Sequence, residues 1–186
     1  MSIIIFVYLF SIKQREIIMK KLTQYCLVFA LFAAQSTYSY AGGDGLTVSK
    51  HVVVNAPADE VWALVGDYNS LDQWHPAITK SELRGDGRSG GDIRVLTLAD
   101  GNALYDELTA YDEAAKQYTY RLLKSPLPLY GYLGSMVVSD NGNNTSTIKW
   151  KSRFYADGVS DAEAVELIQG VYTAGLTSLK ARFDQK

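Results

Sequence analysis

The chain is poor in the residues that enzymes most often use for catalysis. Its 186 residues include one cysteine, Cys26, and two histidines, His51 and His75. No Gly-x-Ser-x-Gly motif, phosphate-binding loop or dinucleotide fingerprint occurs. No His, Asp and Glu residues have metal-ligand spacing. The sequence therefore predicts neither a metal site nor a nucleotide or other cofactor, and it offers little catalytic equipment.

Apolar runs long enough to span a membrane are also lacking. The run from Tyr25 to Ala34 is mostly apolar, follows the basic start Met19-Lys20-Lys21 and precedes Ser39-Tyr40-Ala41, where small residues suit a signal peptidase. This pattern predicts a signal peptide over residues 1–41 and a secreted, periplasmic protein with no stable membrane insertion after cleavage. Residues 1–18 lie upstream of the pattern, so translation is expected to start at Met19. A longer signal or an uncleaved anchor is the alternative.

Cleavage after Ala41 would leave residues 42–186 as one domain without cysteine. The first 41 residues hold four basic residues and one acidic residue, which leaves 14 basic and 19 acidic residues in the domain. This acidic balance argues against nucleic acid and anionic membranes as main partners.

A strand, a turn and two short helices are predicted near the start of the domain. The valines Val52 to Val54 favour a strand, and Pro57 suits the first position of a helix. A second short helix would end before Trp74, because His75 precedes Pro76 and is therefore disfavoured in helical geometry. The first helix has an apolar stripe with helical spacing, formed by Ala58, Val61, Trp62 and Val65.

Short strands separated by turn residues follow. Asp-Gly and Asn-Gly pairs between them are strong hairpin signals, and the short connections favour an antiparallel meander. The predicted strands are Ile78–Arg84, Ile93–Leu98, Ala103–Tyr111, Gln117–Leu123, Tyr130–Ser139 and Thr145–Tyr155.

A long helix is predicted at the C-terminus, from Asp161 to Phe183. Ser160 and Glu163 form a capping-box pattern before it. Gly170 and Gly175 lie inside it, which indicates either close packing on the sheet or room for a ligand beneath the helix. Its apolar positions recur at spacings of three and four, at Val165, Ile168, Tyr172, Leu176, Leu179 and Phe183.

These features together resemble a known superfamily. The motif Ala56-Pro57-Ala58-x-x-Val61-Trp62, the segment Trp74-His75-Pro76, the Asp100-Gly101 hairpin and the terminal helix are similar to those of the START-like (SRPBCC) superfamily. This superfamily includes the major birch-pollen allergen, plant abscisic acid receptors and bacterial polyketide cyclase/dehydrase proteins. Small secreted members of the last group, labelled MxaD-like after a periplasmic factor linked to methanol oxidation, look similar to this chain.

The resemblance implies an α+β helix-grip fold of the Bet v 1/START-like type. In this fold a curved seven-stranded antiparallel sheet surrounds the C-terminal helix, with two short helices after the first strand and a ligand cavity inside. Leu98–Gly101 and Ser125–Leu129 occupy the places of the receptors' gate and latch loops, although their sequences differ from those motifs. Lys80, in Ile78-Thr79-Lys80-Ser81, occupies the place of the lysine that binds the hormone carboxylate.

Aromatic residues supply the remaining site candidates. Thirteen tyrosines offer apolar rings with polar tips, which suit a cavity for a partly polar hydrophobe, although a tyrosine on a strand is as readily an outer-face residue. His75 is a candidate general base or a cap of the turn that contains it. The predicted ligand-binding residues are Trp74, His75, Lys80, Arg94, Tyr105, Tyr120, Tyr132 and Tyr172.

Three functions remain open at this point. The first is a secreted protein that binds a small hydrophobic or amphipathic ligand. The second is a cyclase- or dehydratase-like enzyme, in which His75, Asp106 or a tyrosine would move protons. The third, implied only by the MxaD resemblance, is an accessory factor that docks on a periplasmic dehydrogenase.

Overall fold

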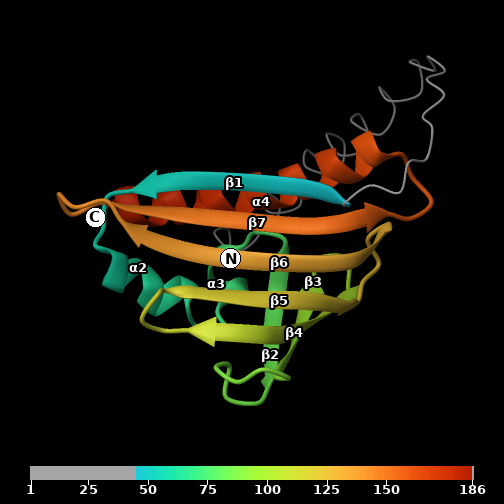
Figure 1. Ribbon diagram of the computed structural model, residues 1–186, viewed down its shortest axis with the longest axis horizontal. Coiled ribbons are helices and arrows are strands. Elements are labelled where there is room, and N and C mark those ends of the chain that lie inside the picture. The colour runs from blue at the N-terminus through green and yellow to red at the C-terminus, as the bar shows by residue number, and fades with distance from the viewer. Residues whose placement is uncertain (1–44, 186) are drawn as a thin grey trace, which may run out of the picture. The chain divides into compact units, whose positions relative to one another are not determined.

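The computed structural model describes residues 45–185, so the predicted signal peptide lies outside the described residues. Each predicted strand from Ile78 onward and the terminal helix are present, with bounds within one residue of the prediction (Figure 1). The elements in chain order are β1 (Leu46–Val54), α2 (Ala58–Val65), α3 (Leu71–Trp74), β2 (Ile78–Arg84), β3 (Ile93–Leu98), β4 (Ala103–Asp112), β5 (Gln117–Lys124), β6 (Leu129–Asp140), β7 (Ser146–Ala156) and α4 (Asp161–Asp184).

The seven strands form one antiparallel sheet in the order β1-β7-β6-β5-β4-β3-β2, so β1 and β2 are its edges. Register shifts occur in the pairing of β2 with β3, of β4 with β5 and of β6 with β7. Such bulges bend a strand and increase its twist. The resulting sheet is strongly curved, and β2 and β3 run across the direction of β1 and β7 (Figure 1).

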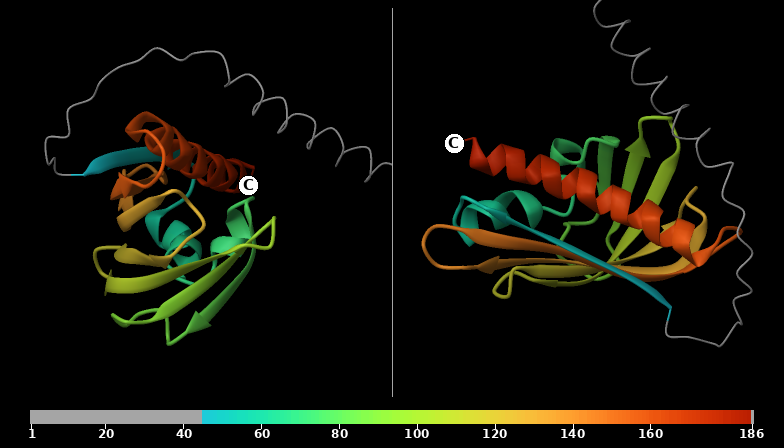
Figure 2. Two further views of the ribbon diagram at one scale, coloured as in Figure 1. Left: turned by 90° about the vertical axis from the view of Figure 1, so that its right-hand side faces the viewer. Right: turned by 90° about the horizontal axis from the view of Figure 1, so that it is seen from above.

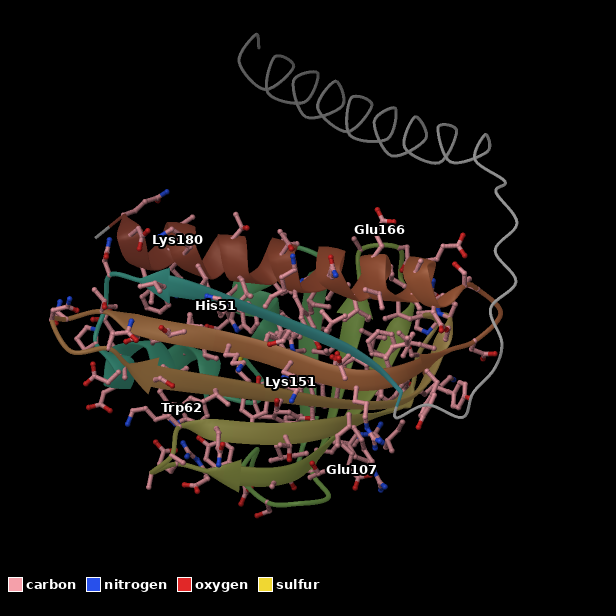
Figure 3. The ribbon with its side chains drawn as sticks, turned by 45° about the horizontal axis from the view of Figure 1, so that its top comes forward. His51, Trp62, Glu107, Lys151, Glu166 and Lys180 are labelled. Carbon is pink, nitrogen blue, oxygen red and sulfur yellow. The ribbon has the colours of Figure 1, made fainter. Side chains whose placement is uncertain are left out.

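Helix α4 lies across the concave side of this sheet (Figure 2). The predicted capping box is confirmed, because Ser160 Oγ accepts from the Glu163 amide and the Glu163 carboxylate accepts from the Ser160 amide. Val165 is only half-buried, and Glu166 points away from the sheet (Figure 3). The side chains that α4 buries are Ala164, Ile168, Tyr172, Leu176, Leu179 and Phe183.

The two short helices fill the remaining space inside the curve of the sheet. Pro57 is the N-cap of α2, and the expected face of this helix is buried. The Trp62 ring packs at a tilt against Tyr111 and Tyr118, with ring centroids 5.7 and 6.1 Å apart. In α3, Trp74 Nε1 donates to Ser70 Oγ at 3.2 Å. The helix-grip arrangement predicted from the sequence is therefore confirmed.

Candidate functional site

A cavity of about 100 Å³ lies between the concave face of the sheet and α4. Side chains alternate between the two faces of a strand, so one residue in two from β3, β4 and β5 faces this cavity. Helix α4 supplies the opposite wall, and α3 with the start of β2 closes one side. The wall consists of Leu71, His75, Ala77, Ile78, Arg94, Leu96, Leu98, Leu104, Asp106, Tyr120, Leu122, Leu127, Tyr132, Trp150, Ile168, Val171 and Tyr172.

A buried ion pair forms part of the polar wall. Arg94 on β3 and Asp106 on β4 are cross-strand neighbours, and their side chains are only 2% and 4% exposed. Arg94 Nη2 donates to Asp106 Oδ2 at 2.7 Å, and Nη1 donates to the Tyr68 carbonyl at 2.6 Å. The guanidinium also lies over the Tyr68 ring, 4.1 Å from its centroid. Arg94 is thus held on one side by a carboxylate and on the other by an aromatic face.

The two partners carry opposite charges at neutral pH. Burial by itself lowers the pKa of Arg94, but the charge of Asp106 more than offsets this, so the pKa is raised above its usual range. Burial raises the pKa of Asp106, and the adjacent Arg94 opposes that shift. A neutral Asp106 would leave the Arg94 charge buried without a counter-ion, which is strongly unfavourable.

Four aromatic polar groups form a continuous hydrogen-bonded chain beside the ion pair. Trp150 Nε1 donates to Tyr120 Oη at 2.8 Å. The Tyr120 and Tyr132 hydroxyls are 3.1 Å apart, and the Tyr132 and Tyr172 hydroxyls are 2.5 Å apart. The Trp150 ring stacks on that of Tyr172, with centroids 4.3 Å apart. Three strands and α4 therefore meet in one network.

A glycine makes this network possible. Gly134 on β6 lies opposite Tyr120 on β5, and a Cβ atom at Gly134 would be 2.4 Å from Tyr120 Cζ. The Tyr120 ring therefore lies directly across β6 and reaches the indole of Trp150 on β7. Any larger residue at position 134 would displace the ring.

The tyrosines of the network are neutral hydrogen-bonding groups. Burial raises the pKa of Tyr120 and Tyr132 well above the usual value, and neighbouring tyrosines raise it further. Burial also raises the pKa of Tyr172. At physiological pH each ring consequently keeps its hydroxyl hydrogen and can donate one hydrogen bond.

His75 lies at the cavity wall with both ring nitrogens engaged. Nε2 is 3.0 Å from the Val171 carbonyl of α4, and Nδ1 accepts from the Ala77 amide at 3.2 Å. A carbonyl only accepts, so Nε2 carries the hydrogen and Nδ1 is the acceptor. Burial lowers the pKa of His75, against the opposing effect of the Val171 bond. A neutral ring thus ties the turn after α3 to α4.

The structure brings five of the eight predicted ligand-binding residues to the cavity wall: His75, Arg94, Tyr120, Tyr132 and Tyr172. Trp74 packs behind the wall, edge-on to Trp150 with centroids 5.7 Å apart. Lys80 and Tyr105 lie elsewhere. Lys80 is exposed and pairs with Glu82 at 3.0 Å, and the Tyr105 ring packs under Lys124.

Sequence reasoning did not identify Trp150 as a site residue, and it treated Ile168 only as part of the apolar stripe. Trp150 alternates with exposed Lys149 and Lys151, a pattern that places it on the inner face. Asp106 was named only for the enzyme hypothesis and lies in the wall. The two loops compared with a gate and a latch each contribute a leucine to the wall, Leu98 and Leu127.

Two further features bear on the chemistry of this domain. Over residues 45–185, no group of three or more His, Cys, Asp or Glu side chains is arranged to hold a metal ion. Within the same range, no helix combines the length and the apolar character needed to cross a membrane.

Residues 45–184 match the family described as "Polyketide cyclase / dehydrase and lipid transport". No curated protein matches the chain.

Solved structures extend the comparison. XoxI from Bacillus cereus is 32% identical, has a TM-score of 0.69, and is matched over 74% of this chain and 94% of that chain. A putative uncharacterized protein from Bacillus thuringiensis is also 32% identical, with a TM-score of 0.70 over 74% of this chain and 98% of its own. The ZhuI aromatase/cyclase from Streptomyces is 19% identical, with a TM-score of 0.62 over 74% of this chain and 92% of its own, so this likeness shows the fold alone.

Proposed function

This chain belongs to the polyketide cyclase/dehydrase and lipid transport family, and we propose that it binds a small, largely apolar molecule between its sheet and α4. The observation that carries the proposal is the cavity, whose wall is mostly leucine, isoleucine and aromatic rings with a few converging polar groups. Such a composition is typical of binding sites for small molecules.

The volume of the cavity limits the size of the ligand. Small-molecule pockets commonly measure about 300–1,000 Å³, and an apolar cavity of about 150 Å³ can hold benzene. The cavity of about 100 Å³ is smaller than that benzene-binding cavity, so without movement of its wall it suits only a short chain. A larger ligand would require movement of the half-buried leucines at its edge, which include Leu98 and Leu127.

We propose mass spectrometry under non-denaturing conditions on protein purified from its native host, followed by a thermal screen of the molecules found. A true ligand at about one hundred times its dissociation constant stabilises the fold by about 2.7 kcal/mol. For a domain of this size, the melting midpoint should rise by roughly 5–11 °C.

Adjacent leucines on opposite faces of β5 provide matched variants. Leu122 lines the cavity, whereas Leu123 is 47% exposed on the outer face. Leu122→Trp should fill the cavity and abolish the shift, and Leu123→Trp should preserve it. If both variants respond to ligand like the wild type, the ligand binds elsewhere.

A cyclase- or dehydratase-like activity is the second candidate. It is supported by the position of Asp106 and Arg94, a carboxylate and a guanidinium held in an otherwise apolar cavity. In the same screen, a ligand that is consumed over time by the wild type, but not by Asp106→Asn at a temperature where melting shows that variant to be folded, would establish the enzyme.

The remaining predictions concern the cellular role. Export to the periplasm is supported by the signal-peptide pattern over residues 1–41. An accessory role beside a periplasmic dehydrogenase stays a prediction from the MxaD resemblance, and a pull-down with the exported protein would test it.

A further inference from the structure

The polar wall of the cavity holds one more hydrogen than its own hydrogen bonds consume. Trp150 has one N–H and no acceptor, and Tyr120, Tyr132 and Tyr172 each have one O–H. These four groups are joined by three hydrogen bonds. Each bond uses one hydrogen, so one of the four hydrogens is left without an acceptor among these four groups.

One hydrogen is left over whichever hydroxyl donates and whichever accepts in each hydrogen bond of the network. The indole can only donate, so its hydrogen is always used at Tyr120. The remaining hydrogen then belongs to Tyr120, Tyr132 or Tyr172, according to which oxygens accept. The buried Ser152 hydroxyl makes no other hydrogen bond within residues 45–185 and interacts with the Tyr172 hydroxyl, which acts to lower the pKa of Tyr172 against the effect of burial. Recruiting Ser152 would add one oxygen and one hydrogen, so the surplus would persist.

A second unfilled donor lies in the same wall. Arg94 is 2% exposed, and its Nε–H has no hydrogen-bond partner among the described residues. Unsatisfied buried donors are rare and costly, and a bound acceptor would satisfy them. A bound acceptor in the cavity would satisfy either donor.

The wall offers no free positive charge to an anion. Arg94 is the only lysine or arginine in the described wall, and Asp106 already neutralises it. His75 is neutral, with both nitrogens engaged. A carboxylate would bring a negative charge into an apolar space without a counter-ion, which is strongly unfavourable. Lys80, which the sequence suggested as a carboxylate partner, lies outside this wall.

Building on the binding function above, we propose that the ligand is a small neutral molecule with an acceptor such as a carbonyl oxygen, and that a single substituted ring enters when the half-buried leucines at the cavity edge move. Its oxygen takes the surplus hydrogen of the tyrosine chain, and its ring lies among the leucines. The site thereby selects neutral carbonyl compounds against both hydrocarbons and carboxylates of the same shape.

Three single-ring probes of nearly identical shape test this selectivity by calorimetry at pH 7.5: acetophenone, ethylbenzene and benzoate. Acetophenone should bind about 3–10-fold more tightly than ethylbenzene, because a typical net hydrogen bond contributes about 0.5–1.5 kcal/mol. Benzoate should bind at least about ten-fold more weakly than acetophenone. The infrared carbonyl stretch of bound acetophenone should shift to a lower frequency than in hexane.

The hydrogen count also predicts the behaviour of variants. Tyr132→Phe removes the central hydroxyl and separates Tyr120 from Tyr172, so each of these keeps a hydrogen without an acceptor. The preference for acetophenone over ethylbenzene should therefore survive or increase. Tyr155→Phe alters an outer-face ring that stacks on Tyr130 at 5.1 Å, and it should leave the preference unchanged.

Several results would overturn the inference while leaving the binding function intact. They are equal affinities for acetophenone and ethylbenzene, tighter binding of benzoate, an unshifted carbonyl stretch, or loss of the preference in Tyr132→Phe with unchanged affinity for ethylbenzene. Failure of all three probes, together with the absence of any ligand in the mass-spectrometric experiment, would overturn the binding function itself and this inference with it.

Discussion

At the scale of single residues, neighbouring positions on one strand have opposite roles. Asp106 faces inward and neutralises Arg94. The next residue, Glu107, faces outward (Figure 3). Its carboxylate accepts two hydrogen bonds from Arg121 Nη2, at 2.8 and 2.9 Å. Arg121 is 56% exposed, so solvent weakens the outer pair, while the inner pair has no such screening.

We expect Asp106→Asn to lower the free energy of unfolding by about 3–5 kcal/mol, because the Arg94 charge would stay buried without its counter-ion. Glu107→Gln is the matched control, and its cost should stay below about 1 kcal/mol. Urea unfolding measures both changes. Equally small losses in the two variants would show that the inner pair does not carry full charges.

His75 should make stability depend on pH. Burial holds the pKa of folded His75 below that of the unfolded chain, about 6.5. Between these values the unfolded chain binds more protons, so stability is lost as pH falls below about 6.5, by up to roughly 1.4 kcal/mol per pH unit.

Urea unfolding between pH 7.5 and 5 should show this loss in the wild type and in His51→Gln, which removes the exposed histidine of β1. His75→Gln should lack this component of the loss. A His75→Gln profile that runs parallel to the wild type would contradict the assignment.

At the scale of elements, the two glycines of α4 answer the question that the sequence left open. Gly175 packs closely on the aromatic residues below it, because a Cβ atom there would be 2.6 Å from His75 Cδ2 and 3.0 Å from the Trp74 and Trp150 rings. Gly170 is exposed, and nothing lies within 4 Å of its potential Cβ. Gly175 is thus required by packing, whereas Gly170 only destabilises the helix through its backbone flexibility.

Opposite effects are expected from the same substitution at these two positions. Gly170→Ala should raise the free energy of unfolding by about 0.5–1 kcal/mol, since alanine favours helix. Gly175→Ala should lower it by about 1–2 kcal/mol, because overpacking against rigid rings outweighs the gain in helix propensity. Thermal melts of both variants measure the difference. A stabilising Gly175→Ala would mean that the helix shifts easily away from the rings.

The order and bounds of these elements could be predicted from the sequence because they depend on local patterns. Turn pairs such as Asn141-Gly142 end the strands, and Ser160 with Glu163 begins the helix. The orientation of some strands was harder to read. On β3, Ile93 and Val95 make one face apolar while Leu96 and Leu98 make the other face apolar, so either face could be the inner one.

The site could be predicted only in part, because its contacts join distant segments. On β4, Leu104 and Leu108 share a face with Asp106, a signal that favours Asp106 as a wall residue over Tyr105, which we predicted as a ligand-binding residue. The stacking of Trp150 on Tyr172 joins β7 to α4, and no spacing within either element indicates it. Lys80 was placed by resemblance alone, without support from the pattern around it.

At the scale of the whole molecule, the described residues form a domain that needs no disulfide, since its range contains no cysteine. The predicted export signal precedes it. We expect the exported protein to begin at Gly42, because the small residues Ser39 and Ala41 suit cleavage there. N-terminal sequencing of protein from the native host tests this, and a first residue of Met1 or Met19 would refute it.

The open sheet has two unpaired edge strands, β1 and β2, and each has side chains that oppose pairing with another molecule. An unpaired strand edge can recruit a strand from another molecule, and charged side chains oppose this. On β2, the exposed Lys80, Glu82 and Arg84 occupy alternate positions. On β1, the Lys180 ammonium donates to the Val53 carbonyl and occupies an acceptor that a foreign strand would otherwise use. For Lys80 this suggests a role unrelated to any ligand, since an exposed charge on edge strand β2 opposes the addition of a strand from another molecule.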